Sequence, residues 1–391
     1  MIYSLEELFD LQMGKTPPRN KVDYWSIKDN KWISIGDLSQ AGRYIYETKE
    51  YISDEAVVKS GIKVIPANTV IMSFKLSIGK VAITKENMYS NEAIMAFNDK
   101  HTTELLPEYV YYLFRNKDWS IGTNKAVMGK TLNKATLSQM KINVCSIQKQ
   151  REIVSVLNKV SGIIDDMKDQ ISALDTLIKS RFVEMFGNIQ INDKNFTKAP
   201  MGEYMTLLTD FSSNGSYRTL DSGVTMYDEP NYAWMVRTTD LESNDMLAIK
   251  YIDKQAYELL AKSKIFGGEI IMNKIGSAGK IYLMPRIDMP ASLGRNAFMF
   301  RFDERINVVF LYYLLVSDYG QREIQQYVRG AVTKTITKDD ARAVLIIEPP
   351  IELQNQFAAF VHQTDKLKVE YQKTLEKTQM LFDSLMQQYF G

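Results

Sequence analysis

The feature that most constrains the fold of this 391-residue chain is an internal duplication. The stretch IMSFKLSIGK at residues 71–80 returns as IMNKIGSAGK at residues 271–280, with Ile, Met, Ser, Gly and Lys in the same places. Further matches follow in the same order, and KTLNK at 130–134 returns as KTITK at 334–338, an offset of 204. A period near 200 is too long for a solenoid, so the sequence predicts two copies of one large unit.

Each copy is expected to contain a globular part of mixed structure followed by a long helix. Short β-branched segments such as 69–72 and 81–84 are bounded by Gly, Pro or Asn, which is typical of strands. Aromatic segments at 108–115 and 308–316 have the spacing of buried helices. We therefore expect an α+β fold with four parts: a first domain (1–146), a central helix (147–187), a second domain (188–346) and a C-terminal helix (347–391).

The two long helices carry apolar residues at heptad spacing. This spacing is the pattern of a coiled-coil seam, and two such stripes can bury each other. Because one helix leads into the second domain and the other ends the sequence, the expected arrangement is an antiparallel coiled coil with a domain near each end. The alternative, in which each helix folds back on its own domain, stays open at this point. The expected seam, also a candidate surface for partner docking, comprises Ile153, Leu157, Val160, Ile164, Met167, Ile171, Leu174 and Ile178, then Phe357, Val361, Tyr371, Leu375, Phe382 and Leu385.

Residues able to support catalysis or hold a metal are sparse. His101 and His362 are the two histidines, and Cys145 is the single cysteine, so a histidine relay or a multi-histidine metal site is not expected. The Gly-Lys-Thr at 129–131 lacks the glycine that a phosphate-binding loop needs five positions earlier. The stretch 229–232 lacks the paired prolines of an amino-methyltransferase motif. The sequence therefore predicts a chain with no catalytic site and no metal site.

The bulk properties favour a cytoplasmic protein. No run of 18 uninterrupted apolar residues exists, and the first residues lack the basic and apolar regions of a signal peptide. One cysteine excludes an internal disulfide framework and fits a reducing compartment. The net charge of +1 gives no nucleic-acid signal by itself. A DNA-binding interpretation must therefore rest on local arrangement.

The repeated stretches gather residues that suit contact with a nucleic acid. Glycine and serine allow a backbone to come close, and lysine and serine donate to phosphate oxygens. Arginine and asparagine pair with guanine and adenine edges. Ordinary lysines on a hairpin turn are the competing interpretation. The candidate DNA contacts are Lys75, Ser77, Lys80, Lys130, Thr131 and Lys134 in the first copy, and Lys274, Ser277, Lys280, Arg295, Asn296, Arg329, Lys334 and Lys338 in the second.

With these features in place, the whole chain resembles the specificity subunit of a type I restriction-modification system. The resemblance depends on the duplicated order of a variable domain, a Gly-Lys-Thr or Thr-Lys-Thr turn, and a stretch of the form Ile-x-x-Pro-Pro-x-x-x-Gln before a long helix. Residues 346–354, IIEPPIELQ, match that last element, whereas 144–150, VCSIQKQ, lack both prolines.

The resemblance implies a non-enzymatic subunit that reads a split, asymmetric site on double-stranded DNA. It implies that each domain recognises one half of the site and that the paired helices act as a spacer and as a platform for two methyltransferase subunits. S-adenosylmethionine would belong to those partners, which would methylate adenines, and motor-nuclease restriction subunits would cut unmodified DNA. Two other functions compete: a fused methyltransferase or nuclease enzyme, and a bivalent protein-binding scaffold.

Overall fold

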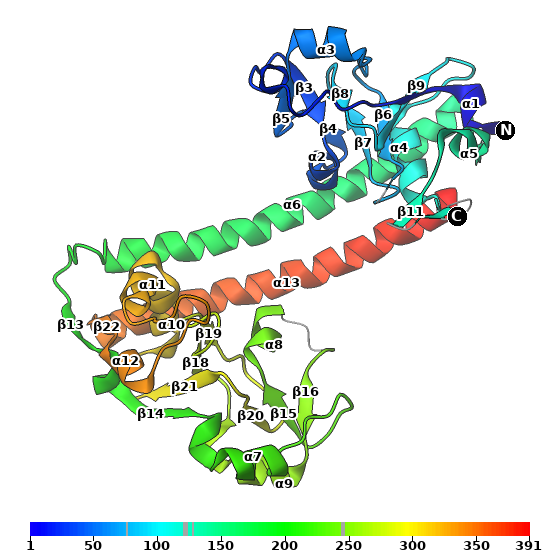
Figure 1. Ribbon diagram of the computed structural model, residues 1–391. Coiled ribbons are helices and arrows are strands. Elements are labelled where there is room, and N and C mark those ends of the chain that lie inside the picture. Colours follow the sequence, from blue (N-terminus) through cyan, green and yellow to red (C-terminus); the bar gives the residue numbers. More distant parts are fainter. Residues whose placement is uncertain (76, 120–123, 127–128, 244–246) are drawn as a thin grey trace. The chain divides into compact units, whose positions relative to one another are not determined.

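The computed structural model describes residues 1–75, 77–119, 124–126, 129–243 and 247–391 (Figure 1). They form two compact units: unit 1 is Met1–Asp169 with Gln372–Gly391, and unit 2 is Gln170–Tyr371. Each unit therefore contains one globular domain and a segment of each of two long helices, α6 (Ile147–Phe186) and α13 (Ile351–Phe390).

The domain of unit 1 is built on two sheets. A five-stranded sheet has the order β2-β9-β6-β7-β4, and a three-stranded sheet has the order β5-β3-β8. The strands are β1 (Ile2–Ser4), β2 (Phe9–Met13), β3 (Asn30–Ile33), β4 (Tyr44–Ile45), β5 (Glu50–Ile52), β6 (Val70–Ser73), β7 (Val81–Thr84), β8 (Tyr89–Ser90), β9 (Ile94–Asp99), β10 (Asn124–Ala126), β11 (Gly129–Thr131) and β12 (Lys141–Asn143). The helices are α1 (Leu5–Leu8), α2 (Ile35–Gln40), α3 (Asp54–Ser60), α4 (Pro107–Asn116) and α5 (Lys134–Gln139).

The domain of unit 2 repeats this topology. Its sheets have the orders β14-β21-β18-β19 and β16-β15-β20-β17. The strands are β13 (Thr197–Pro200), β14 (Met205–Asp210), β15 (Ala233–Val236), β16 (Lys250–Ile252), β17 (Lys264–Ile265), β18 (Ile270–Asn273), β19 (Ile281–Leu283), β20 (Ala291–Leu293), β21 (Ala297–Phe302) and β22 (Leu345–Glu348). The helices are α7 (Tyr217–Gly223), α8 (Thr238–Ser243), α9 (Lys254–Leu259), α10 (Val308–Val316), α11 (Asp318–Gln325) and α12 (Lys338–Ala343).

The matching strand orders confirm the duplication at the level of structure. β2-β9-β6-β7 in unit 1 corresponds to β14-β21-β18-β19 in unit 2. The parallel pair β3·β8 corresponds to the parallel pair β15·β20, with Trp32 and Trp234 at equivalent places. β6 and β18 are buried along their whole length, which explains why both read as continuous apolar runs. The expected mixed helix-and-sheet fold with two related domains is confirmed.

The two long helices run antiparallel within each unit, as expected. The start of α6 and the end of α13 belong to unit 1, and the end of α6 and the start of α13 belong to unit 2. In unit 2 the rings of Phe182 and Phe357 lie 5.3 Å apart, and Lys368 Nζ lies 2.5 Å from Asp175 Oδ1. Each helix is 40 residues long, which corresponds to about 60 Å. α13 begins at Ile351 because Pro349 and Pro350 follow β22, so the expected start at 347 falls inside that strand.

The seam residues are buried most deeply near the helix ends, where the helices also pack on the domain cores. Ile153 and Leu157 are buried, whereas Met167, Ile171 and Leu174 are half-buried. In unit 1 the ring of Phe382 lies 6.1 Å from that of Tyr112 on α4. The buried anchors that the expected seam omits are Phe182, Met185, Phe186 and Met386. The coiled-coil seam and the docking of the helices on the domains are therefore continuous.

Candidate nucleic-acid interface

The duplicated stretches form the same turn in both units. In unit 1 the amide of Gly79 donates to Ser73 O at 2.9 Å, and in unit 2 the amide of Gly279 donates to Asn273 O at 2.8 Å. Both glycines have φ of +87°, a left-handed conformation that favours glycine. A Cβ on Gly279 would lie 2.5 Å from Ile324 Cγ2, and one on Gly79 would lie 3.2 Å from Trp119 Cδ1. The repeated glycine is thus required by the turn and by its packing.

The repeated lysine at the end of each turn is engaged within its own domain. Lys80 Nζ donates to Ser39 Oγ of α2 at 2.5 Å, and Lys280 forms an ion pair with Glu242 of α8. The two helices are equivalent, so each lysine connects the same turn to the same helix. The serines of the turns, Ser77 and Ser277, are exposed. Contact of these residues with DNA stays a prediction.

In unit 2 the structure brings most of the second copy's candidates into one cluster. The amide of Gly276 donates to Lys334 O at 2.9 Å, and that of Lys274 donates to Asn296 O at 2.8 Å. Arg329 is joined to the same loop through reciprocal backbone hydrogen bonds with Thr335. The turn, the 294–296 segment and the 329–338 loop therefore share one side of the domain.

Asp210, at the end of β14, occupies the centre of this cluster. Lys274 Nζ donates to its Oδ2 at 2.6 Å, Lys338 Nζ donates to its Oδ1 at 2.9 Å, and Ser213 Oγ donates to Oδ1 at 2.6 Å. Burial opposes ionisation of Asp210, but these hydrogen bonds outweigh it and lower the pKa to about 2. Two lysines expected to face DNA are therefore held by a carboxylate of their own domain.

The two arginine candidates of unit 2 also have acidic partners. Arg329 donates to Asp340 Oδ1 at 2.7 Å, and Arg295 donates to Asp221 Oδ1 at 3.2 Å. The Arg329 guanidinium remains 69% exposed at its side chain. These ion pairs orient the two guanidinium groups but leave them exposed to solvent.

Unit 1 is built differently at the same place. The amide of Leu132 donates to Phe74 O at 3.0 Å, which reproduces the contact of Ile336 with Lys274 O in unit 2. Phe74 therefore stands where unit 2 has Lys274, and the strand register places Met13 opposite Met95, where Asp210 is opposite Phe298. Two apolar residues in unit 1, the buried Phe74 and the exposed Met13, thus stand at the positions of the ion pair of unit 2.

The first copy's lysines have fewer internal partners. Among the described residues, Lys75, Lys80 and Lys134 take part in no ion pair. Lys134 is exposed at the first position of α5. Lys130 and Thr131 lie in β11, paired with β10, and their side chains fall outside the described part of the structure.

The structure marks out one group that lies outside the repeated motifs, Arg19. Its guanidinium lies 3.7 Å from the ring centroid of Trp25 and 4.9 Å from that of Trp32. It also pairs with both oxygens of Glu50, and this hydrogen-bonded pair raises the pKa of Arg19. Arg19 lies outside the stretches that the two copies share, so the duplication does not point to it. The nearby aromatic residues, Tyr24 and Trp25, are the signal that was present.

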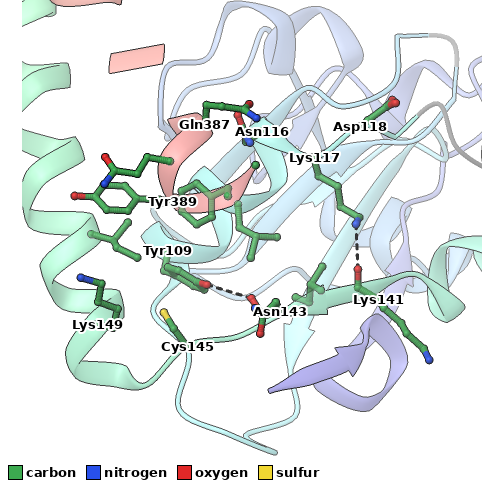
Figure 2. Close-up of a pocket in the computed structure, with 16 residues that line it drawn as sticks. Tyr109, Asn116, Lys117, Asp118, Lys141, Asn143, Cys145, Lys149, Gln387 and Tyr389 are labelled. Atoms are coloured by element: carbon green, nitrogen blue, oxygen red, sulfur yellow. Dashed lines mark hydrogen bonds between the residues drawn. The ribbon is translucent and has the colours of Figure 1, made fainter. Parts of the chain in front are cut away.

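A hollow of about 620 Å³ lies in unit 1 where the end of α13 meets the domain (Figure 2). Lys117 Nζ donates to Lys141 O at 3.0 Å, and Tyr109 Oη donates to Asn143 O at 3.2 Å. Burial lowers the pKa of Lys117 and raises that of Tyr109. Cys145 is half-buried at this hollow. The residues that line the hollow include no histidine and one side-chain carboxylate, that of Asp118.

Metal-binding clusters and membrane-spanning helices are both absent from the described part of the chain. No group of three or more His, Cys, Asp or Glu side chains is placed to hold a metal ion. No helix among the described residues is long and apolar enough to cross a membrane.

Comparison with known proteins gives a consistent match. The family model "Type I restriction modification DNA specificity domain" matches residues 1–175 and again 206–378. The MjaIX specificity subunit of Methanocaldococcus jannaschii is 24% identical, over 98% of this chain and 91% of its own length. The EcoR124I/EcoR124II specificity subunit of Escherichia coli is 29% identical over 40% of this chain and 39% of its own length.

Solved structures agree at the level of the fold. The S subunit of a type I restriction-modification system from M. genitalium covers 100% of this chain and 96% of its own, with a TM-score of 0.57 and 14% identity. A chain from a structure of type I complex assembly and conformational transition has a TM-score of 0.56, also at 14% identity, over 100% of this chain and 97% of its own.

Proposed function

Since the chain belongs to the type I restriction-modification DNA specificity family, which makes it a specificity subunit, we propose that it reads a bipartite, asymmetric DNA site with one half-site for each unit. The observation that supports this proposal is that the two domains share the same turn and strand register but carry different side chains there. The turns around Gly79 and Gly279 are the same, but Phe74 and Met13 stand where the second unit has Lys274 and Asp210. Two domains with the same turn and different side chains around it suit two different DNA sequences.

The reaction chemistry is assigned to partner subunits. DNA and the other subunits of the restriction-modification system are the partners of a specificity subunit. We assign the adenine methylation and the S-adenosylmethionine to two methyltransferase subunits docked along α6 and α13, and cleavage to restriction subunits. The exposed apolar residues Ile163 and Leu177 on α6 and Leu367 and Met380 on α13 support a docking role for the helices. The proposed location is the cytoplasm, where these partners and their DNA meet.

The helices are proposed to set the gap between the half-sites. Their seam of heptad spacing fixes the register of α6 against α13 within each unit. Half-sites must match the helical repeat of DNA, roughly 34–36 Å per turn, so a rigid spacer suits this role. The length of the paired helices, rather than the domains, would then determine the number of unread base pairs.

Methylome sequencing of cells with and without this gene tests the proposal. The expected result is the loss of one bipartite adenine-methylated motif when the gene is removed, and its return with a plasmid copy. An unchanged methylome in cells that express the partner subunits would contradict the proposal. Methyl transfer by the isolated chain, supplied with labelled S-adenosylmethionine, would favour a fused enzyme instead. Absence of salt-sensitive DNA binding with partners present would favour a protein-binding scaffold.

A further inference from the structure

One turn occupies the same place in both domains, but the charged residues at and around it differ between the two units. The turn between β8 and β9 in unit 1 corresponds to the turn between β20 and β21 in unit 2. Glu92 lies two residues before β9, and Arg295 lies two residues before β21, so they hold equivalent positions. In each unit the segment that follows β2 or β14 comes back to this turn, since Thr16 bonds to Glu92 and Phe211 lies against Arg295. A carboxylate in one unit thus replaces a guanidinium in the other.

In unit 1 the cation comes from the returning segment. The Arg19 guanidinium lies over Trp25 at 3.7 Å and near Trp32 at 4.9 Å, and Glu50 accepts from two of its nitrogens. The side chain is nevertheless 51% exposed. Glu92 contributes a second negative charge that favours this placement. Arg19 is therefore held in one orientation at the surface.

In unit 2 the roles are reversed, because the turn supplies the cation and the returning segment supplies its support. The Arg295 guanidinium lies 5.0 Å from the ring centroid of Phe211 and 5.8 Å from that of Tyr217. Asp221 of α7 accepts from it at 3.2 Å, and the side chain is 43% exposed. Both units therefore place a stacked, ion-paired and solvent-accessible guanidinium at the same corner without sharing the residue that supplies it.

We propose that Arg19 and Arg295 are the base-reading groups of the two units, each contacting a guanine in its own half-site. The proposal rests on the proposed function, because it names which side chains of that interface read bases. A guanidinium has five N–H donors. The contacts with Glu50 use two of them and the contact with Asp221 uses one, which leaves donors for the O6 and N7 acceptors of guanine in the major groove.

The surrounding groups explain why arginine, rather than lysine, is needed at these places. An aromatic face supports a planar guanidinium, and a carboxylate fixes the direction of its fork, so less orientation is left to be lost on binding. Lys274 and Lys338 are committed to Asp210, and Lys80 and Lys280 to α2 and α8. Beside Arg295, a hollow of about 330 Å³ is lined by Thr238, Thr239 and Asn296, which adds further polar groups next to the guanidinium.

The first test uses the unaltered chain with its partner subunits. Once the methylome gives the motif, each guanine in a DNA duplex is replaced in turn by 7-deazaguanine, which lacks the N7 acceptor. We expect one guanine in each half-site to lose roughly 5- to 100-fold in binding or methylation rate, as befits a bidentate arginine contact. A half-site that contains no guanine, or whose guanines all tolerate the replacement, would overturn the proposal for that unit.

The second test assigns each guanine to its arginine. Arg295→Ala should relax the sequence requirement at one guanine of one half-site, leave the other half-site and the gap unchanged, and abolish the effect of 7-deazaguanine at that position. Arg19→Ala should do the same in the other half-site. Arg305→Ala is the matched control, because Arg305 also lies over an aromatic ring, Tyr204 at 4.6 Å, and pairs with Asp303, but follows the opposite end of β21.

Conservative variants separate base reading from phosphate contact. Arg295→Lys and Arg19→Lys keep the charge but not the fork, so they should relax specificity nearly as much as alanine. Variants that weaken all sequences equally would show a phosphate contact and overturn the proposal. Full rescue by lysine would show that the fork of the guanidinium is not used and would overturn it too. A wild-type complex with no bipartite specificity would instead refute the proposed function itself. Thermal unfolding of each variant checks that the fold is retained, and the 7-deazaguanine series decides the matter if a variant does not fold.

Discussion

Replacing Asp210 with asparagine should destabilise unit 2 in a pH-dependent way. The Asp210 side chain is 8% exposed, and its carboxylate accepts hydrogen bonds from Lys274 at 2.6 Å and from Lys338 at 2.9 Å. Asparagine keeps the shape but removes the charge, so two ammonium groups lose their partner. Lys274 suffers most, because its side chain is 16% exposed whereas that of Lys338 is 33% exposed.

The magnitude follows from the pKa of Asp210, which falls from 3.8 to about 2 in the folded chain. One pKa unit corresponds to about 1.36 kcal/mol, so the ionised carboxylate contributes about 2 to 3 kcal/mol to the free energy of unfolding. A depressed folded pKa means that this contribution is present above the unfolded value and is lost as pH falls. About 1 kcal/mol should be gone at pH 3, and most of the rest by pH 2.

The assay is chemical denaturation of wild type and Asp210→Asn at pH 7, 5, 4 and 3, with hydrogen exchange of β14 and β18 to report on unit 2. We expect a difference of about 2 to 3 kcal/mol at pH 7 that narrows at pH 3. Equal stability of wild type and Asp210→Asn, or a difference that does not change with pH, would refute the reasoning.

Three further changes probe the fold and the spacer. Gln354→Leu removes a fully buried side-chain amide that accepts a hydrogen bond from the backbone amide of Asn307 at 2.8 Å and donates to two carbonyls. Thermal unfolding should therefore show a loss of about 2–4 kcal/mol in the free energy of unfolding, and an unchanged melting temperature would contradict this. Gly279→Ala should cost about 1–3 kcal/mol, measured by denaturation, because the positive φ and the contact with Ile324 both oppose a Cβ. The control is Gly162→Ala, which should instead stabilise by about 0.5–1 kcal/mol, because Gly162 lies inside α6 with open space for a Cβ. Inserting one heptad into both α6 and α13 adds about 10 Å and should lengthen the gap of the methylated motif by about three base pairs with the half-sites unchanged; new half-sites with the old gap would exclude the spacer role.

The large features of the fold were predictable because they depend on repeated apolar and glycine positions. The turns at 71–80 and 271–280 need a residue with positive φ, and glycine marks it in both copies. The helix seam was readable for the same reason, since a heptad pattern survives in residues that face a core. Its continuation to Met185 keeps the same spacing and was visible in the sequence, whereas the buried Phe182 lies one position beyond the seam position at Arg181.

The partners of the site residues were not predictable, because they come from distant parts of the chain. Lys274 meets Asp210 across 64 positions, and Lys280 meets Glu242 across 38. No local pattern links a lysine after one strand to a carboxylate at the end of another. The sequence therefore located the loops that gather in unit 2, but it did not show that several of their cations already have internal partners.

A repeated fold also limits what can be transferred from one half of the chain to the other. Glu92 and Arg295 hold equivalent positions, so matching the copies residue by residue would assign to Glu92 the role of a base-reading cation, for which its charge has the wrong sign. The structure instead places Arg19 at that corner, from a different segment, with Trp25 and Glu50 replacing the support that Phe211 and Asp221 give to Arg295. Both units have a guanidinium at this turn that lies near an aromatic ring and is oriented by a carboxylate. Different supports around it leave each unit free to read different neighbouring bases.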